Sequence, residues 1–169
     1  TVSIDAAPLD HFTISTIASP KTAGTNFSFT VSAFDAFENA VSFSGTLTLT
    51  DNTNTLTPTS VLMSGTTVTV NNANITLAQS GVQITASGGG KSETSNTFTV
   101  NPAGVTSFSL SIIGTQTAGT GFALTITAVD AFGNVASGFT GTVSITPNSG
   151  TLTPTTSGAF VAGVRTETI

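Results

Sequence analysis

Aspartate and asparagine occur four residues apart at two places in the chain, namely Asp35 with Asn39 and Asp130 with Asn134. Carboxylate and amide oxygens are ligands that calcium accepts, so each pair is a weak candidate for a metal site. The same residue types also form tight turns, in which their side chains hydrogen-bond to the nearby backbone. One carboxylate in each loop falls short of the roughly six to eight oxygen ligands that calcium takes. We therefore expect a structural turn at both places, with no metal and no cofactor.

Other residues that carry chemistry in enzymes have no suitable partners in the sequence. His11 is the single histidine and has only Asp10 beside it, so we expect an exposed residue without a catalytic role. The glycines at 88–90 precede Lys91 without a helix pattern after them, which indicates a hairpin tip and not a phosphate-binding loop. No Gly-x-Ser-x-Gly motif stands before a helix pattern. The sequence therefore predicts a protein that is not an enzyme.

Composition indicates a folded protein whose surface carries hydroxyl groups in place of charges. Hydrophobic residues make up 38% of the chain and charged residues only 7%, whereas 36 residues are threonine. Twelve phenylalanines with no tryptophan or tyrosine indicate aromatic residues that fill a core. The net charge of -5 argues against a nucleic-acid partner. No apolar run reaches the roughly 18 residues of a membrane span, so we expect no membrane insertion within this segment.

Apolar and hydroxyl residues alternate along short stretches that turn residues separate. From Phe27 to Ala33 every second residue is apolar, and the same alternation recurs from Phe122 to Ala128. A period of two places one face of a strand in a core and the other in water. Further strands are expected at residues 12–17, 46–50, 66–70, 74–77, 82–87 and 97–100. Many short strands with one buried face favour an all-β fold of antiparallel β-sandwiches.

The sequence repeats at a spacing of about 95 residues, which is the size of a whole domain. The matching stretches are 34–40 with 129–135, 23–25 with 118–120, 43–46 with 139–142, and 56–59 with 152–155. We therefore expect a complete sandwich over residues 9–103 and a second, C-terminally incomplete sandwich over residues 104–169. Residues 1–8 are expected to be the last strand of a preceding repeat, or a donor strand that completes the sandwich of another molecule.

These repeated motifs resemble the immunoglobulin-like repeats of bacterial and archaeal cell-surface proteins of the invasin and filamin types. In such repeats Ala-Gly-x-x-Phe precedes Ala-x-Asp-x-x-Gly-Asn and a Gly-Thr strand. The second copy carries Asp130, Gly133 and Asn134, whereas the first copy has Glu38 in place of the glycine. The resemblance covers essentially the whole chain. It implies tandem immunoglobulin-like antiparallel β-sandwiches located outside the cell or on its surface.

The expected function is that of a structural repeat module in an extracellular cell-surface, filament or surface-layer protein, acting as spacer, stalk or assembly unit. Its expected partners are neighbouring repeats of the same protein, with homotypic assembly by strand addition as a variant. One alternative is an adhesin or carbohydrate-binding module that uses its end loops, and another is an accessory domain of a secreted hydrolase. Asn26 and Asn74 begin glycosylation sequons and are candidate N-glycosylation sites.

Overall fold

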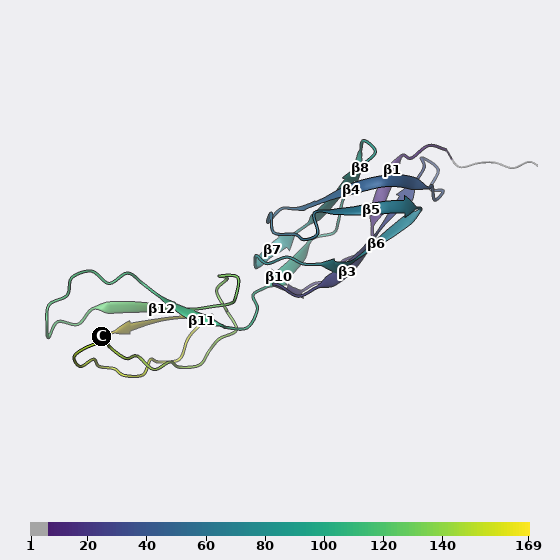
Figure 1. The fold of residues 1–169 in the computed structure, drawn as a ribbon. Coiled ribbons are helices and arrows are strands. Elements are labelled where there is room, and N and C mark those ends of the chain that lie inside the picture. The colour runs from purple at the N-terminus through teal and green to yellow at the C-terminus, as the bar shows by residue number, and fades with distance from the viewer. Residues whose placement is uncertain (1–6) are drawn as a thin grey trace, which may run out of the picture. The chain divides into compact units, whose positions relative to one another are not determined.

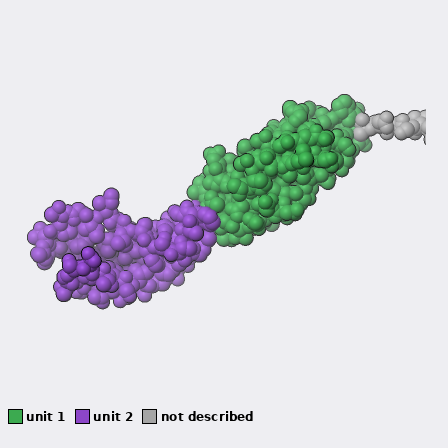
Figure 2. All heavy atoms as spheres, viewed as in Figure 1, with its two compact units in different colours: residues 1–101 green, residues 102–169 purple. Residues whose placement is uncertain are grey.

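The computed structural model describes residues 7–169, which form β-strands, turns and loops without a helix (Figure 1). The predicted all-β class is thereby confirmed. The chain divides into two compact units, unit 1 with residues 1–101 and unit 2 with residues 102–169 (Figure 2). The strand or donor segment expected at residues 1–8 lies mostly outside the described residues. Across residues 7–169, no helix of the length and apolarity of a membrane span is found.

Unit 1 is built from short strands that follow one another closely along the chain. They are β1 (His11–Ile14), β2 (Lys21–Thr22), β3 (Phe27–Phe34), β4 (Phe43–Asp51), β5 (Ser60–Gly65), β6 (Thr67–Ala73), β7 (Gln79–Val82), β8 (Ile84–Gly88), β9 (Lys91–Thr94) and β10 (Phe98–Asn101). They form three sheets with the strand orders β1-β3-β6, β5-β4-β8-β9 and β2-β10-β7. The strand β10 runs parallel to β2 and antiparallel to β7, and the remaining named pairs of unit 1 are antiparallel.

Alternation along β3 directs its apolar side chains into the core of unit 1. Phe27, Phe29, Val31 and Ala33 are buried, whereas the hydroxyl residues between them are exposed or half-buried, as the sequence predicts. The other two sheets contribute to the same buried cluster through Leu47, Leu49, Val82, Ile84, Ala86, Phe98 and Val100. One hydrophobic core therefore joins the three sheets of unit 1.

The chain of unit 1 changes sheets at Gln83, where one continuous strand was predicted for residues 82–87. The strand β7 ends at Val82 and pairs with β10, whereas β8 begins at Ile84 and pairs with β4. The Gln83 backbone N–H donates to Oδ1 of Asn52 at 3.2 Å, which fixes the corner. Alternation does not reveal this corner, because the residues on both sides of it are buried as they would be in one strand.

Other strand predictions need smaller corrections. The strand predicted at 74–77 is wrong, because Asn74 forms only an isolated bridge with Thr57. The strands β2, β5 and β9, and residues 79–81 of β7, were not predicted as strands. The hairpin expected around the glycines at 88–90 is confirmed, because Gly88 pairs with Lys91 at the end of the β8–β9 ladder.

Unit 2 contains one named sheet, in which β12 (Ala123–Val129) lies between β11 (Ser107–Leu110) and β13 (Val164–Thr168). Both pairs are antiparallel. Leu124, Ile126 and Ala128 of β12 are buried, which confirms the predicted inward face of this strand. Phe122, predicted to face the same way, is half-buried.

Three phenylalanines from different parts of unit 2, Phe108 of β11 with Phe139 and Phe160, pack edge to face on one another. The ring centroids of Phe139 and Phe160 are 5.0 Å apart, and those of Phe108 and Phe139 are 5.3 Å apart. The loops that carry Phe139 and Phe160 are tied by backbone hydrogen bonds, such as Phe160 N–H to the Gly141 carbonyl at 3.0 Å. The buried core of unit 2 contains fewer residues than that of unit 1.

Candidate functional site

Asp35 follows β3 directly, and its carboxylate is buried inside the turn that it forms. Its Oδ1 accepts the backbone N–H groups of Phe37 and Asn39, both at 2.9 Å. Its Oδ2 accepts the side-chain Nδ2 of Asn39 at 3.0 Å and the backbone N–H of Ala7 at 2.9 Å. The carboxylate therefore holds its own turn and also a residue 28 positions earlier in the chain.

Asp130 makes the same set of contacts after β12 in unit 2. Its Oδ1 accepts the backbone N–H groups of Phe132 and Asn134 at 2.9 Å. Its Oδ2 accepts Nδ2 of Asn134 at 2.8 Å and the backbone N–H of Ala103 at 2.9 Å. We call these two clusters the aspartate turns. Because both copies reproduce the long-range bond, it belongs to the repeat and not to one copy.

Ala7 and Ala103 occupy equivalent places, four positions before the first strand of their units. The sequence does not reveal that these alanines bind the aspartates. They bind through the backbone N–H, which every residue except proline has, and the acceptor lies 27 or 28 residues away. The aspartate turns thus attach the segment that leads into β1 to the end of β3, and the segment that leads into β11 to the end of β12.

Hydrogen bonding keeps both aspartates ionised despite their burial. Burial opposes the ionisation of Asp35, but the side chain of Asn39 and the backbone N–H groups of Asn39, Ala7 and Phe37 outweigh this effect and lower its pKa from 3.8 to about 2. The pKa of Asp130 is lowered as well, again because hydrogen bonds, led by that of Asn134, outweigh burial. Both carboxylates are therefore negative at neutral pH and satisfied by N–H donors.

Acid is expected to destabilise unit 1 as the pH falls from about 4 to about 2. The folded-state pKa of Asp35 lies below its ordinary value of 3.8, so the unfolded chain binds the proton more tightly than the folded chain. The stabilising contribution is therefore complete above about pH 4 and is lost as the pH falls through about 2. Urea unfolding at a series of pH values checks this by comparing the wild type with Asp35→Ala. Equal pH dependence of the two proteins would contradict it.

Oxygen ligands for a cation are not assembled in the aspartate turns. Asn39 directs its NH2 group, and not its oxygen, toward the Asp35 carboxylate, and Asn134 does the same toward Asp130. Those N–H donors occupy the lone pairs that a metal would use. Among residues 7–169, no group of three or more His, Cys, Asp or Glu side chains is placed to hold a metal. The geometry of the two pairs is that of the turn expected from the sequence.

The residue three positions after Asp35 or Asp130 adopts a left-handed backbone, with φ of 64° at Glu38 and 83° at Gly133. Left-handed backbone is unfavourable for a residue with a Cβ, so Glu38→Gly is expected to raise the free energy of unfolding of unit 1 by about 1 kcal/mol. Gly133→Glu is the matched reverse change and should lower the free energy of unfolding of unit 2. A Cβ at position 133 would meet no atom within 4 Å, so the left-handed backbone is the only source of the penalty. Urea unfolding of both variants checks the prediction, and effects of the same sign would refute it.

A further buried aspartate, Asp51, was not singled out from the sequence. Its Oδ1 accepts the backbone N–H groups of Thr55 and Leu56, both at 3.0 Å, and its Oδ2 accepts the Thr53 N–H at 3.0 Å and the Thr53 hydroxyl. The stretch Asp51-x-Thr53 could have signalled this turn, because Asp and Thr side chains commonly bond to the backbone two residues on. Asp51 therefore closes the loop after β4 and has a structural role.

His11 is not the exposed residue that the sequence predicts. It begins β1, is half-buried, and stacks on Phe34 with ring centroids 5.7 Å apart. Its Nδ1 lies 3.3 Å from Oδ2 of Asp10, and its Nε2 lies 3.7 Å from Oε1 of Glu38. No serine or threonine hydroxyl is hydrogen-bonded to the His11 ring in the described part of the chain, so the contacts give no nucleophile for it to activate.

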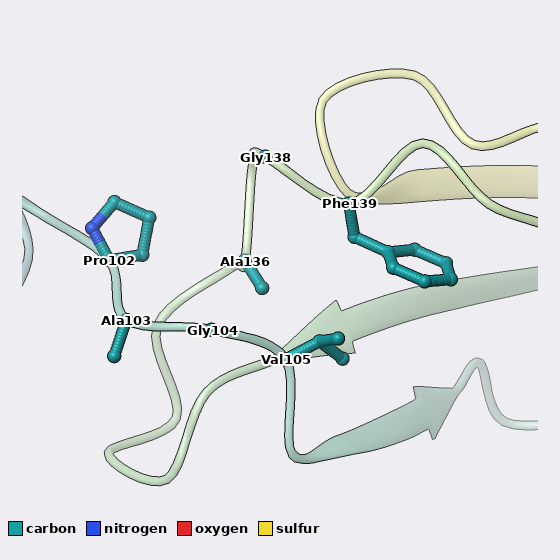
Figure 3. A pocket seen from close by; sticks show the side chains of 7 residues that line it. All are labelled: Pro102, Ala103, Gly104, Val105, Ala136, Gly138 and Phe139. Atoms are coloured by element: carbon teal, nitrogen blue, oxygen red, sulfur yellow. The ribbon is translucent and has the colours of Figure 1, made fainter.

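An open hollow of about 390 Å³ lies beside Ala103 in unit 2 (Figure 3). Its lining consists of Pro102, Ala103, Gly104, Val105, Ala136, Gly138 and Phe139. All of these side chains are apolar, so the hollow presents no acid, base or metal ligand.

Comparisons with known proteins give distant structural likenesses only. No protein-family model matches the sequence, and no curated protein matches it. The solved structure of surface layer protein SbsC, domains 1–6, is 23% identical with a TM-score of 0.42, and the match covers 88% of this chain and 21% of that one. Domains 5–6 of the S-layer protein SbsC are 18% identical with a TM-score of 0.39, covering 88% of this chain and 81% of that one.

This chain thus spans about a fifth of the length of the longer SbsC structure. Its likeness to these surface-layer domains is at the level of a β-rich fold.

Proposed function

We propose that this chain is a pair of structural repeat modules from an extracellular cell-surface or filament protein, in which each module serves as a spacer, stalk or assembly unit. The observation that carries the proposal is the duplicated aspartate turn. In it the carboxylates of Asp35 and Asp130 accept hydrogen bonds from the backbone N–H groups of Ala7 and Ala103. Buried charged groups in a catalytic site are instead directed at a pocket. Here the two polar clusters that the repeat duplicates hold the chain at the start of each repeat.

An immunoglobulin-like sandwich is the architecture that we propose for the complete repeat. In unit 1 the β1-β3-β6 and β5-β4-β8-β9 sheets contribute to one buried cluster, which is the arrangement of two packed antiparallel sheets. Unit 2 repeats the first of these sheets as β11-β12-β13. The proposed repeats cover residues 9–103 and 104–169, whereas the two compact units divide between residues 101 and 102.

The spacer proposal is tested by varying the number of modules. One, two or three copies of the full chain would be placed between a membrane anchor and a displayed epitope on a cell. A spacer should increase antibody access to the epitope with each added copy, because each module adds length. Access that does not change with copy number would overturn the proposal.

A binding module is the second candidate, because an aromatic side chain is exposed at the same position of both aspartate turns. Phe37 is 77% exposed and Phe132 is 47% exposed. Repeated exposed aromatic residues are typical of contact surfaces. A glycan array probed with the wild type and with Phe37→Ser separates the candidates, since only an adhesin should bind and lose binding in the variant. A third candidate is an accessory domain of a secreted hydrolase, and no contact among the described residues favours it over the other two.

Of the two candidate glycosylation sites, Asn26 is expected to be modified in large excess over Asn74. Asn26 is exposed, whereas Nδ2 of Asn74 donates to the Gly24 carbonyl at 2.7 Å and to Oδ1 of Asn26 at 3.0 Å. A glycan bonded to Nδ2 of Asn74 would displace at least one of these hydrogen bonds. Mass spectrometry of the chain secreted from a glycosylating host checks this, with Asn26→Gln as control. Equal occupancy of the two sites would contradict the expectation.

A further inference from the structure

The strand β5 lies at one edge of the four-stranded sheet of unit 1, whose strand order is β5-β4-β8-β9. Within residues 7–169 it pairs with β4 alone, so no strand covers its other side. Its sequence, Ser-Val-Leu-Met-Ser-Gly, contains no charged residue and no proline. The opposite edge of the same sheet, β9, carries Lys91 and Glu93. Charges and prolines on an edge strand oppose pairing with other chains, so β9 is protected and β5 is not.

The backbone N–H and C=O groups of Ser60, Leu62 and Ser64 point away from β4. In an antiparallel pair, every second residue of a strand bonds to the partner, and the residues between direct their groups to the other side. The Leu49 N–H donates to the Thr59 carbonyl at 2.8 Å, so the odd-numbered residues of β5 are those that bond to β4. The three even-numbered residues therefore present their backbone groups at the open edge.

Leu62 is the central residue of these three, and it is 68% exposed. Its side chain lies on the outer face of the sheet, as do those of Ser60 and Ser64. On the inner face Met63 is buried in the core and Val61 packs against it. The open edge of β5 thus combines unpaired backbone groups with an apolar side chain in water, which are features that favour pairing with another strand.

Unit 2 has an equivalent edge at the place where β5 lies in unit 1. The bridge between Ser144 and Thr156 repeats the pair at the start of β5 at a spacing of 96. Gly158 is therefore the counterpart of Leu62. The comparison of these two positions shows how the repeat treats the same edge in its two copies.

Charged side chains of unit 2 cover this edge. The backbone N–H of Gly158 donates to Oε1 of Glu167, which is 8% exposed and also bonded to Nε of Arg165 at 2.7 Å. The Arg165 guanidinium lies over the same glycine, because a Cβ at Gly158 would come within 2.6 Å of it. In β6 of unit 1 the corresponding residues are Val68 and Val70, whose side chains cannot accept a hydrogen bond. The edge group that unit 2 satisfies internally is consequently open in unit 1.

The open edge of β5 is complementary to itself. When a second β5 lies antiparallel with Leu62 opposite Leu62, Ser60 of each copy lies opposite Ser64 of the other, so the three residues with free backbone groups meet one another. Val61 then lies opposite Met63, and both belong to the inner face. A shift of one residue would place free groups opposite groups that already bond to β4. No charges oppose each other, because β5 has none.

We propose that the β5 strands of two copies of this chain pair antiparallel, with Leu62 opposite Leu62, and form a dimer whose β-sheet continues from one copy into the other. Each copy contributes the same strand, so the contact is isologous and closes at two copies. A single pair of six-residue strands is a small contact, so the dimer forms reversibly and at high protein concentration. This inference rests on the assembly role within the proposed function and names the strand that assembly uses.

Charge substitution at position 62 tests the contact, with sedimentation velocity of the full chain over a range of concentrations as the measurement. The wild type should show a monomer–dimer equilibrium. Leu62→Lys and Leu62→Glu should each weaken dimerisation by about tenfold or more, because each places two like charges opposite each other. A mixture of the two variants should dimerise again, because position 62 faces itself and the charges are then opposite.

The matched control is Ser92→Lys, which adds the same charge on the same face of the sheet but at the β9 edge. It should leave dimerisation unchanged, and circular dichroism verifies that every variant keeps its β-structure. A wild type that stays monomeric at all concentrations would overturn the proposal. Undiminished dimers of Leu62→Lys would overturn it as well, because another surface would then carry the contact. An equal loss in Ser92→Lys, or a mixture that stays monomeric, would have the same meaning.

Single cysteines test the register, because the chain has no cysteine of its own. Residues opposite each other on neighbouring strands lie within the Cα separation that a disulfide spans. Leu62→Cys should therefore form disulfide-linked dimers under mild oxidation, read by non-reducing electrophoresis. Ser60→Cys should form about tenfold fewer, because position 60 lies opposite position 64 and not opposite itself. Equal linking in the two variants, or linking in neither, would refute this register.

These results are separable from the test of the spacer role. Monomers together with copy-dependent epitope access would refute the β5 contact and leave the spacer role standing. Dimers that Leu62→Lys weakens, together with epitope access that does not change with copy number, would support the contact and refute the spacer role.

Discussion

Phe12→Ala is expected to lower the free energy of unfolding of unit 1 by about 3–5 kcal/mol. The Phe12 side chain is 0% exposed and packs edge to face on Phe43 at 5.4 Å between ring centroids. Truncation to alanine removes buried apolar surface and leaves a cavity in a core that three sheets enclose. Urea unfolding, with hydrogen exchange of the β3 amides as the readout, measures the lost free energy of unfolding in unit 1 separately from unit 2.

The repeat supplies a matched control in Phe108→Ala. Phe108 occupies the same place in the second copy at a spacing of 96, but it is 42% exposed. We expect a loss of about 1–2 kcal/mol in unit 2, because much of the ring is already in water. Equal losses at the two positions would show that burial of this ring does not differ between the units in solution.

Asp35→Ala is expected to lower the melting temperature of unit 1 by roughly 10 °C. The substitution leaves the backbone N–H groups of Ala7, Phe37 and Asn39 and the amide of Asn39 without their acceptor. These hydrogen bonds are partly buried around a fully buried carboxylate, and partly buried donors that lose their acceptor are costly. Asp35→Asn should be nearly as harmful, because one end of the new amide presents N–H to donors that need an oxygen.

Asp10→Ala is the control for the loss of a carboxylate at the surface. Asp10 lies 3.5 Å from Nζ of Lys91 in an exposed ion pair, so its removal should change the melting temperature little. Calcium and a chelator should leave the melting temperature of the wild type unchanged. A calcium-dependent rise that Asp35→Ala abolishes would instead show a metal site in the aspartate turn.

Local pattern accounts for the parts of the fold that the sequence predicts correctly. The period of two along residues 27–33 identifies the inward face of β3, because alternation is a property of one strand. The glycines at 88–90 likewise identify the β8–β9 hairpin, because turn geometry depends on adjacent residues. Asp35 and Asn39 identify their turn for the same reason.

Predictions fail where a contact joins residues far apart in sequence. Gln83 separates β7 from β8, yet the alternation of buried residues continues across it, so only the partner strands reveal the corner. His11 is stacked on Phe34 because β1 pairs with β3, and nothing near His11 in the sequence indicates that ring. The bonds from Ala7 to Asp35 and from Ala103 to Asp130 are of the same kind.

The sequence by itself determined an all-β protein, a repeat of about 95 residues, the inward faces of β3 and β12, and the turns at Asp35 and Asp130. Only the tertiary structure decided which strands lie side by side and how deeply equivalent residues are buried. Ile17 and Phe108 show why, since Ile17 is 2% exposed in unit 1 with its backbone bonded to the side chain of Asn96, 79 positions away, whereas Phe108 is 42% exposed although its counterpart Phe12 is fully buried. Burial depends on what packs against a residue, and that partner is chosen by distant parts of the chain.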